Sequence, residues 1–418
     1  MSKLIKPYGS DELLSPFNEI GVNLADVEQM PKFLLNDSAI ANVVMLGSGY
    51  FNPLQGFMNK TEAISVCDEL RTLNGLFWPI PVLNITREMP DFKIGEKVAL
   101  LDSSQDHNPC IAIMNISDVE FLSDQDLNYF CMRIFGTNDC NHPGVNKFKK
   151  LGNYLVSGSI EVSQLSTFPM DHPDTFRTAS QLREIITDLG WRKIVAFQTR
   201  NPMHRAHEEV CRIACERINA DGLIIHMLLG KLKEGDIPAK TRDECIRTMV
   251  ASYFHDLPVL ISGYGFDMLY AGPREALLHA IVRQNLGATH LIIGRDHAGI
   301  GNFYGEFEAQ EIFDNMSKNL PPLPLPGQLP APPAPGELPI PPGPKDLPQI
   351  DEKKLAELPP LPAPGELPMP PLPGAMPLPP IPAPERKITC QSCGAGITVR
   401  DMTLRKMDCP VCSEVIEM

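Results

Sequence analysis

Apolar and polar positions follow two different patterns along the chain, and the pattern changes near residue 170. Before that point, short apolar runs are bounded by Gly, Asp, Asn and Pro, which is typical of strands joined by turns. The clearest runs cover residues 42–46, 78–86, 97–102 and 110–122. Residues 1–170 are therefore predicted to form a mainly β, barrel-like domain with some helix.

Residues 171–318 alternate apolar runs with segments of helical periodicity. The apolar runs cover residues 193–198, 222–230, 257–264 and 290–296, and the amphipathic segments cover 203–218, 240–254 and 272–287. Strands that alternate with helices predict parallel βαβ units, so we expect an α/β domain with a doubly wound parallel sheet. Ligands of such sheets bind beyond the carboxyl ends of the strands.

The composition changes sharply after residue 318. Between Pro321 and Pro384 lie 26 of the 42 prolines, and the hexapeptide APGELP occurs twice. Proline lacks a backbone donor and favours extended polyproline II, so residues 319–386 are predicted to be a disordered, Pro-rich low-complexity linker. Its PxxP elements could also serve as an SH3- or WW-type ligand, although few basic residues flank them.

Bulk properties narrow the class of protein. The chain of 418 residues, 43% of them hydrophobic, is long enough for two or three domains with proper cores. A net charge of −14 argues against a general nucleic-acid or membrane-surface binder. No apolar run approaches the ~18 residues of a transmembrane helix, and the N-terminus lacks the apolar core of a secretory signal. The cysteines form no compact disulfide framework, so we expect a cytoplasmic protein.

The stretch QTRNPMHRAH, residues 198–207, begins where the strand at 193–197 should end. Asn201 and Pro202 have the signature of a helix start, an N-cap followed by proline at the first helical position. Gln198 to Asn201 would then form the strand-to-helix loop, where helix amides favour an anion.

Cationic and donor groups in this stretch strengthen the prediction of an anion site. Arg200 has a permanent charge and forked donors. His204 and His207, three residues apart, would share a helix face and donate to phosphate oxygens. A metal pair is the alternative for these histidines, but no third ligand is nearby. A solvated polar turn explains any one of these residues, but not their joint placement at a strand end.

A second polar loop, GRDHAGIG at residues 294–301, follows the apolar run that begins at His290. By itself it could be an ordinary turn, with Asp296 as a simple cap. It supports a ligand site because it follows a second strand of the same predicted sheet.

The C-terminal segment carries metal-ligand spacing. Two C-x2-C pairs are separated by fifteen residues, and the four thiols are Cys390, Cys393, Cys409 and Cys412. This spacing predicts a tetrahedral structural zinc site in a small zinc ribbon over residues 387–418, which has too little core to fold without metal. A redox-active CxxC motif is the alternative, but redox chemistry needs only one such pair of cysteines, and this segment has two.

Taken together, the motifs resemble those of the ATP sulfurylases (sulfate adenylyltransferases). The hallmark is Q-T-R-N-P-x-H-R-A-H followed by G-R-D-H-A-G, and further matches in order are GYFNPLQGFM, WPIPVLNIT, FGTNDCNHPGV, KEGDIPAKTR and YAGPREALLHAIVRQN. The resemblance covers about residues 1–315. It implies a PUA-like β domain, a Rossmann-like adenylyltransferase domain, and conversion of ATP and sulfate to adenosine 5'-phosphosulfate (APS) and pyrophosphate. The family is commonly oligomeric.

The resemblance also implies a role for each motif residue. Gln198 and Arg200 would bind sulfate with the backbone amide of Ala298, and Thr199, Arg200 and Asn201 would form the catalytic loop. His204 and His207 would contact the ATP phosphates. The nucleotide would lie against residues 198–201 and against Gly294, Arg295, Asp296 and His297. Magnesium would arrive with ATP, because the loops show no dedicated carboxylate cage.

The chain departs from the family after QEIFD, where it enters the proline tract without an S-G-T-x-x-R-type segment. A non-catalytic nucleotide- or sulfate-binding scaffold is therefore an alternative function, and an adenylyltransferase that acts on an organic phosphate or acid is a third. The proline arm or the zinc ribbon could bind a protein partner. There is no G-x-x-x-x-G-K-[ST] loop, so a fused APS kinase is not expected.

Overall fold

In the computed structural model the described residues are 4–18, 24–233 and 235–319, with four short strands near the C-terminus. By its internal contacts the chain divides into residues 1–313 with 373–418, and residues 314–372. The predicted proline linker and the four cysteines of the predicted zinc site lie outside the described residues. No helix of the described part is long and apolar enough to cross a membrane.

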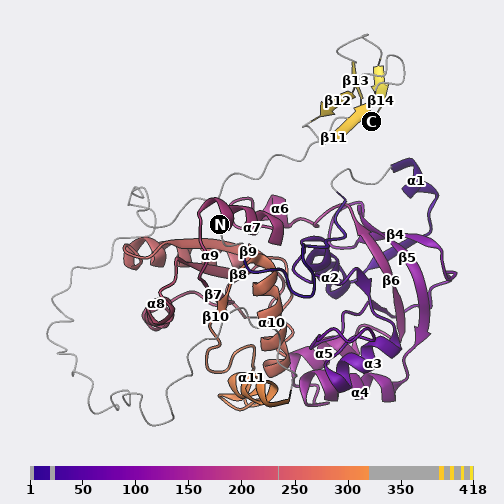
Figure 1. The fold of residues 1–418 in the computed structure, drawn as a ribbon. Coiled ribbons are helices and arrows are strands. Elements are labelled where there is room, and N and C mark those ends of the chain that lie inside the picture. The colour runs from indigo at the N-terminus through magenta and orange to yellow at the C-terminus, as the bar shows by residue number, and fades with distance from the viewer. Residues whose placement is uncertain are drawn as a thin grey trace. The chain divides into compact units, whose positions relative to one another are not determined.

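The N-terminal region is built on a six-stranded sheet with the order β1-β4-β5-β6-β2, and β3 pairs with β6 (Figure 1). All pairs are antiparallel except β1 with β4. The elements are α1 (Leu24–Gln29), β1 (Lys32–Leu35), α2 (Asp37–Gly47), β2 (Gly56–Phe57), α3 (Lys60–Glu69), β3 (Ile85–Thr86), β4 (Lys97–Asp102), β5 (Cys110–Phe121), α4 (Asp124–Phe135), α5 (Pro143–Lys149), β6 (Tyr154–Val162) and α6 (Phe168–Asp171).

Two expected strands of this region are wrong. Residues 42–46 belong to helix α2, whose N-cap Asn36 accepts hydrogen bonds from Ser38 N and Ala39 N. This helix is buried on most of its surface, so its sequence has the continuous apolar run of a buried strand. Within residues 78–86 only Ile85–Thr86 pairs as a strand. The runs at 97–102 and 110–122 form β4 and β5 as predicted.

The second region contains a parallel four-stranded sheet with the order β10-β7-β8-β9. This confirms the predicted α/β class. Its elements are α7 (Ala179–Asp188), β7 (Ile194–Thr199), α8 (Arg205–Ile218), β8 (Gly222–Leu228), α9 (Ala239–Tyr253), β9 (Val259–Tyr264), α10 (Gly272–Leu286), β10 (His290–Leu291) and α11 (Glu308–Asn319). Strand β10 is shorter than the predicted 290–296.

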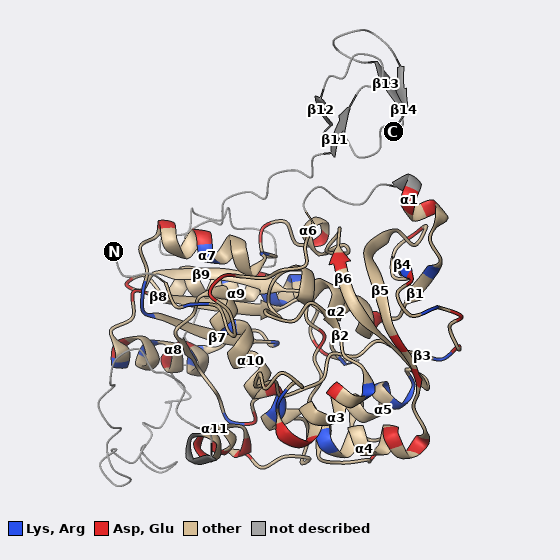
Figure 2. Ribbon diagram, turned by 45° about the vertical axis from the view of Figure 1, so that its right-hand side comes forward, with Lys and Arg blue, Asp and Glu red and all other residues tan. Residues whose placement is uncertain are grey.

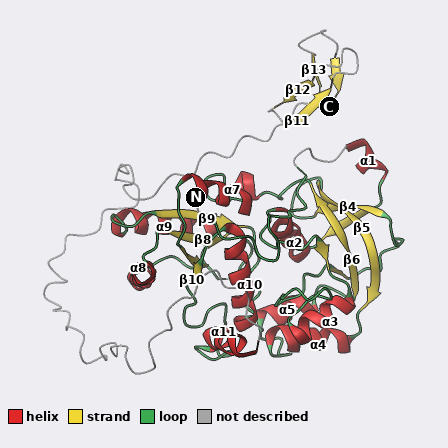
Figure 3. Ribbon diagram, viewed as in Figure 1, coloured by secondary structure: helices red, strands yellow, loops and turns green. Residues whose placement is uncertain are grey.

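Helix α10 lies between the parallel sheet and the helices α3, α4 and α5 of the N-terminal region (Figure 3). Twelve of its fifteen residues are buried, including Glu275, His279 and Arg283. Because α10 is buried on nearly every side, its polar and apolar residues do not separate into two faces, in contrast to the amphipathic α8, so the expectation of an amphipathic segment at 272–287 is wrong.

Near the C-terminus, β11 (Arg386–Thr389) pairs with β12 (Gly396–Val399), and β13 (Lys406–Asp408) pairs with β14 (Val415–Glu417). Both pairs are antiparallel. In the sequence, Cys390 and Cys393 stand between β11 and β12, and Cys409 and Cys412 stand between β13 and β14.

Candidate active site

The parallel sheet reverses its order beside β7. The chain adds β8 and β9 on one side of β7, then returns through α10 to place β10 on the other side. Strands that diverge in this way leave a crevice at their carboxyl ends, where α/β proteins bind ligands. The two polar stretches identified in the sequence, 198–207 and 294–301, stand at the ends of β7 and β10. They meet at this point, because Arg200 donates to Gly299 O.

The described strands β7, β8 and β9 contain no charged residue (Figure 2). Any charge that meets a ligand at the crevice must come from the loops and helix ends. Arg200 is the nearest such cation to the end of β7, one residue beyond Thr199.

Gln198 and Thr199 are the last two residues of β7, so the predicted strand-to-helix loop starts later than expected. The Thr199 hydroxyl donates to Asn201 O over 2.7 Å and accepts from Asn201 N over 3.0 Å. These two bonds close a tight turn around Arg200. They fix the backbone at the point where the guanidinium leaves the sheet.

The expected helix start at Asn201-Pro202 is wrong. Helix α8 begins at Arg205, and its N-cap residue is His204, whose side chain makes no capping bond. Asn201 is held by the Thr199 hydroxyl instead of capping a helix, and Pro202 lies in the connection. His204 and His207 nevertheless come together, because their rings stack with centroids 3.8 Å apart.

His207 is the more enclosed ring of the pair. It packs on Phe197 with centroids 5.3 Å apart, and its Nδ1 is buried without a hydrogen-bond partner in the described structure. Burial, followed by the neighbouring His204, lowers the pKa of His207. A neutral ring with a free nitrogen at a helix N-terminus is suited to bonding a ligand rather than another side chain.

Arg200 ties together the loops around the crevice. Its NH2 group donates to Gly299 O over 3.3 Å, and its NH1 group lies 3.5 Å from Asp236 Oδ2. Its guanidinium also lies over the ring of Tyr270, 4.9 Å from the centroid. Tyr270 OH in turn donates to Asp236 over 3.1 Å. Arg200 is thus placed by residues that follow β7, β8, β9 and β10.

The loop after β10 has a constrained backbone. Asp296 and Ala298 both have positive φ, 53° and 56°, which is uncommon for residues other than glycine. Ala298 is buried, and its carbonyl accepts from Gly272 N at the start of α10 over 3.0 Å. Arg295 remains 65% exposed beside Asp296 and Glu306. Gly294 has open space where a side chain would stand.

Behind the loops lies a buried polar cluster. Gln198 Nε2 lies 3.4 Å from His279 Nε2, and His279 Nδ1 lies 3.0 Å from His297 Nε2. Burial, then His279, lowers the pKa of His297 to about 3. Glu275, 3.5 Å from His279, has its pKa raised to about 7 by burial, although its carboxyl accepts from Leu269 N and Ala271 N.

Sequence reasoning missed four residues of the site: Asp236, Tyr270, Glu275 and His279. Asp236 and Tyr270 sit in loops whose course cannot be read from periodicity. Glu275 and His279 did carry a signal, because two ionisable residues four apart within an apolar helix must be paired or functional.

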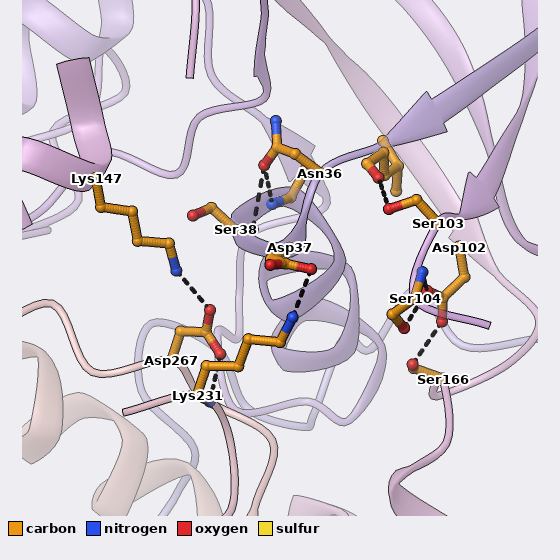
Figure 4. A network of polar contacts seen from close by, with 12 residues as sticks. Asn36, Asp37, Ser38, Asp102, Ser103, Ser104, Lys147, Ser166, Lys231 and Asp267 are labelled. Atoms are coloured by element: carbon orange, nitrogen blue, oxygen red, sulfur yellow. Dashed lines mark hydrogen bonds and ion pairs between the residues drawn. The ribbon is translucent and has the colours of Figure 1, made fainter. Parts of the chain in front are cut away.

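The loop after β8, which carries Asp236, is anchored at its base to the N-terminal region (Figure 4). Asp267 accepts from Lys231 N over 2.7 Å and pairs with Lys147 of α5 over 2.7 Å. The Lys231 ammonium pairs with Asp37 of α2 over 2.7 Å. The site therefore depends on contacts with both regions.

A parallel sheet with two polar loops at its switch point, a tethered arginine and a histidine pair defines an α/β protein built to bind a phosphate-like anion. Comparison with known proteins then identifies the family. Residues 7–165 match the PUA-like domain model, and residues 173–327 match the ATP-sulfurylase model. The sulfate adenylyltransferase of Alcanivorax borkumensis is 51% identical over 317 residues, which cover 75% of this chain and 79% of that one. The sulfate adenylyltransferase of Allochromatium vinosum is 50% identical over 75% of this chain and 80% of its own length.

These relatives show that the chain belongs to the ATP sulfurylase (sulfate adenylyltransferase) family. A solved structure titled "Hexameric APS kinase from Thiobacillus denitrificans" resembles the chain with a TM-score of 0.55 and 26% sequence identity. The resemblance covers 74% of this chain and about half, 55%, of that protein.

Proposed function

We propose that the chain is a sulfate adenylyltransferase that joins ATP and sulfate to give APS and pyrophosphate, reversibly. The observation that carries the proposal is the placement of Arg200, held at the switch point by contacts from the loops after β8, β9 and β10. The comparisons favour the enzyme over a non-catalytic scaffold, since the curated relatives with about 50% identity are enzymes by name.

Each motif residue has a proposed role. Sulfate binds to Gln198, Arg200 and the backbone amide of Ala298, while ATP lies against residues 198–201 and 294–297. Arg200 releases Asp236 when the sulfate dianion takes its place, because a guanidinium binds an oxyanion through two parallel bonds. His204 and His207 donate to the phosphates at the N-terminus of α8, where the helix dipole favours negative charge.

The reaction needs no side-chain nucleophile. A sulfate oxygen attacks the α-phosphorus of ATP, the new sulfur–oxygen–phosphorus bridge forms, and the bond to the leaving pyrophosphate breaks. Both reactants are anions, so the protein contributes by positioning them and neutralising charge as it moves onto the pyrophosphate. Magnesium enters with ATP as part of the substrate.

The test is ATP formation from APS and pyrophosphate by the purified chain. This direction releases the energy of the sulfate–phosphate anhydride, so even weak activity gives signal. Arg200→Ala should abolish it. Arg205→Ala is the matched control, because Arg205 is 65% exposed and its guanidinium pairs with Glu208 and lies over the ring of Tyr253. A folded wild-type chain that makes no ATP would refute the proposal.

Further features belong to the same proposal. The domain boundaries are 1–170 for the PUA-like domain, 171–318 for the catalytic domain, 319–386 for the linker and 387–418 for the zinc ribbon. The protein is cytoplasmic and forms a homo-oligomer, and the proline arm or the ribbon binds a protein partner.

Zinc is proposed at Cys390, Cys393, Cys409 and Cys412, because two thiol pairs at this spacing suit tetrahedral zinc and each pair stands between two paired strands in the sequence. Metal analysis of the purified chain should find one zinc per chain, and Cys390→Ser with Cys393→Ser should remove it.

A further inference from the structure

Helix α10 buries a stripe of three polar side chains. Glu275, His279 and Arg283 follow each other at intervals of four residues, so they lie along one side of the helix. Their exposed fractions are 0%, 0% and 1%. Buried polar groups cost free energy unless they are bonded, so each needs a partner that justifies it.

Within this stripe, His279 contacts both polar segments of the active site. Its Nε2 lies 3.4 Å from Gln198 Nε2, at the end of β7, and 3.5 Å from Glu275 Oε1 on α10 itself. Its Nδ1 lies 3.0 Å from His297 Nε2, in the loop after β10. One imidazole therefore touches a residue from each of the two strands that flank the switch point.

Because a neutral imidazole carries a single N–H, the donor or acceptor role of His279 in one contact fixes its role in the other. It can donate to one neighbour only and must accept from the other. In one polarity the Gln198 amide donates to His279 Nε2, and His279 Nδ1–H donates to His297 Nε2. In the opposite polarity His297 donates to His279, and the Nε2–H of His279 faces two acceptors, Glu275 Oε1 and the Oε1 of a turned Gln198 amide.

The side chain of Gln198 can adopt either polarity. Its Oε1 is buried and has no hydrogen-bond partner in the described structure, so turning the amide would offer His279 an acceptor. The polarity of the contact with His297 thus fixes whether His279 offers Gln198 an acceptor or a donor.

We propose that His279 is a positioning residue that holds Gln198 and His297 in one directional hydrogen-bond chain, so that each of its two contacts positions one side of the active site. The substrate assigned to each side, sulfate to Gln198 and nucleotide to His297, rests on the proposed function. The link itself rests on the contacts of His279 alone. His279 touches neither reacting atom and acts through its two neighbours.

Two amide substitutions separate the contacts. The amide of Asn overlays the position of His Nδ1, and the amide of Gln overlays Nε2. His279→Asn should therefore keep the contact with His297 and lose the one with Gln198, whereas His279→Gln should do the reverse. His279→Leu removes both.

The measurement is the initial rate of pyrophosphate release from ATP and sulfate. His279→Asn should raise the KM for sulfate about tenfold, as expected for a lost buried hydrogen bond, and leave the KM for ATP within about twofold. His279→Gln should give the opposite split. Equal changes of both KM values in both variants would show a merely structural role and overturn the proposal.

The control is His226→Asn, at another fully buried imidazole, which lies on β8 and contacts Tyr50. It should lower the melting temperature without separating the two KM values. A split in this control as large as that in the His279 variants would also overturn the proposal.

A spectroscopic measurement separates this inference from the proposed function. In spectra of the chain with 15N-labelled histidine, His279 and His297 should each be a single neutral tautomer, and His279→Leu should shift both nitrogens of His297. If the wild type releases no pyrophosphate but these shifts appear, the link stands and the assigned reaction fails. Unchanged His297 nitrogens would refute the link whatever the activity.

Discussion

At the scale of single residues, the Thr199 hydroxyl fixes the backbone turn that positions Arg200. It is the only group described that bonds both the amide and the carbonyl of Asn201, and it is nearly buried. Removing it frees the backbone on either side of Arg200, since two hydrogen bonds of about 1 kcal/mol each hold the turn.

We expect Thr199→Val to lower kcat for ATP formation about tenfold or more, because positioning errors in a charge-neutralising site are costly. Thr199→Ser, which keeps the hydroxyl, should retain most of the activity. The check is to compare kcat and melting temperature of both variants. If Thr199→Val and Thr199→Ser lose activity equally, the hydroxyl is not what holds the turn.

Glu275 should give stability a recognisable dependence on pH. Its pKa in the folded chain is about 7, against 4.5 for a free carboxyl, because burial disfavours the charge. Between these values the folded chain holds a proton that the unfolded chain has released. This carboxyl therefore lowers the free energy of unfolding as pH rises from about 4.5 to about 7, by about 3 kcal/mol in total.

Glu275→Gln removes this titration. Glutamine cannot accept from both Leu269 N and Ala271 N, so the variant should be less stable than the wild type at pH 5. The difference should shrink by pH 8, where the wild type must hold a buried charge. Free energies of unfolding in urea at both pH values provide the check. A difference that stays constant would mean that Glu275 titrates alike in both states.

At the scale of elements, α10 joins the two regions through Arg274. Its guanidinium donates to the carbonyls of Val66, Cys67 and Pro79, all from the N-terminal region. It neither pairs with a carboxylate among the described residues nor contacts the loop residues of the site. His279 stands five residues further along the same helix, so Arg274 fixes the helix that carries the proposed link.

Arg274→Met should reduce the free energy of unfolding by roughly 3 kcal/mol, because it leaves three buried carbonyls without a charged donor. Arg274→Lys should lie between Met and wild type, since an ammonium cannot reach all three with the geometry of a fork. Urea unfolding of the three proteins is the measurement. Equal stabilities of Lys and Met variants would contradict the fork argument.

The elements also show what the sequence could reveal. Strands β7, β8 and β9 and helices α8, α9 and α10 were predicted near their observed places, because period and flanking turns agreed. Helix α2 was missed because residues 43–46 within it form an unbroken apolar run, whereas the equally buried α10 has polar residues among its apolar ones. The site loops were found from their charge, but Glu275 and His279 were not, because their role depends on which strands α10 packs against.

At the scale of the whole molecule, the site is shared between two regions. The loop after β8 carries Asp236, which meets Arg200, while the base of that loop is held by Asp267. The Asp267 side chain is 8% exposed and pairs with Lys147 of α5, whereas the Lys231–Asp37 pair beside it is largely exposed. The buried carboxylate should therefore contribute more than the surface pair.

Trypsin can report on this anchor, because Lys231 and Lys233 stand in the loop itself. Asp267→Ala removes the acceptor of Lys231 N and the partner of Lys147, so the loop should open more readily and cleavage after these lysines should accelerate by about tenfold or more. Asp267→Asn keeps an oxygen for Lys231 N and should give a smaller increase. Asp37→Asn, at the exposed pair, should change the rate less than about threefold. Equal acceleration by Asp37→Asn and Asp267→Ala would contradict this prediction. The exposed Lys231–Asp37 pair would then anchor the loop, so the N-terminal region would hold the site through α2 and not through α5.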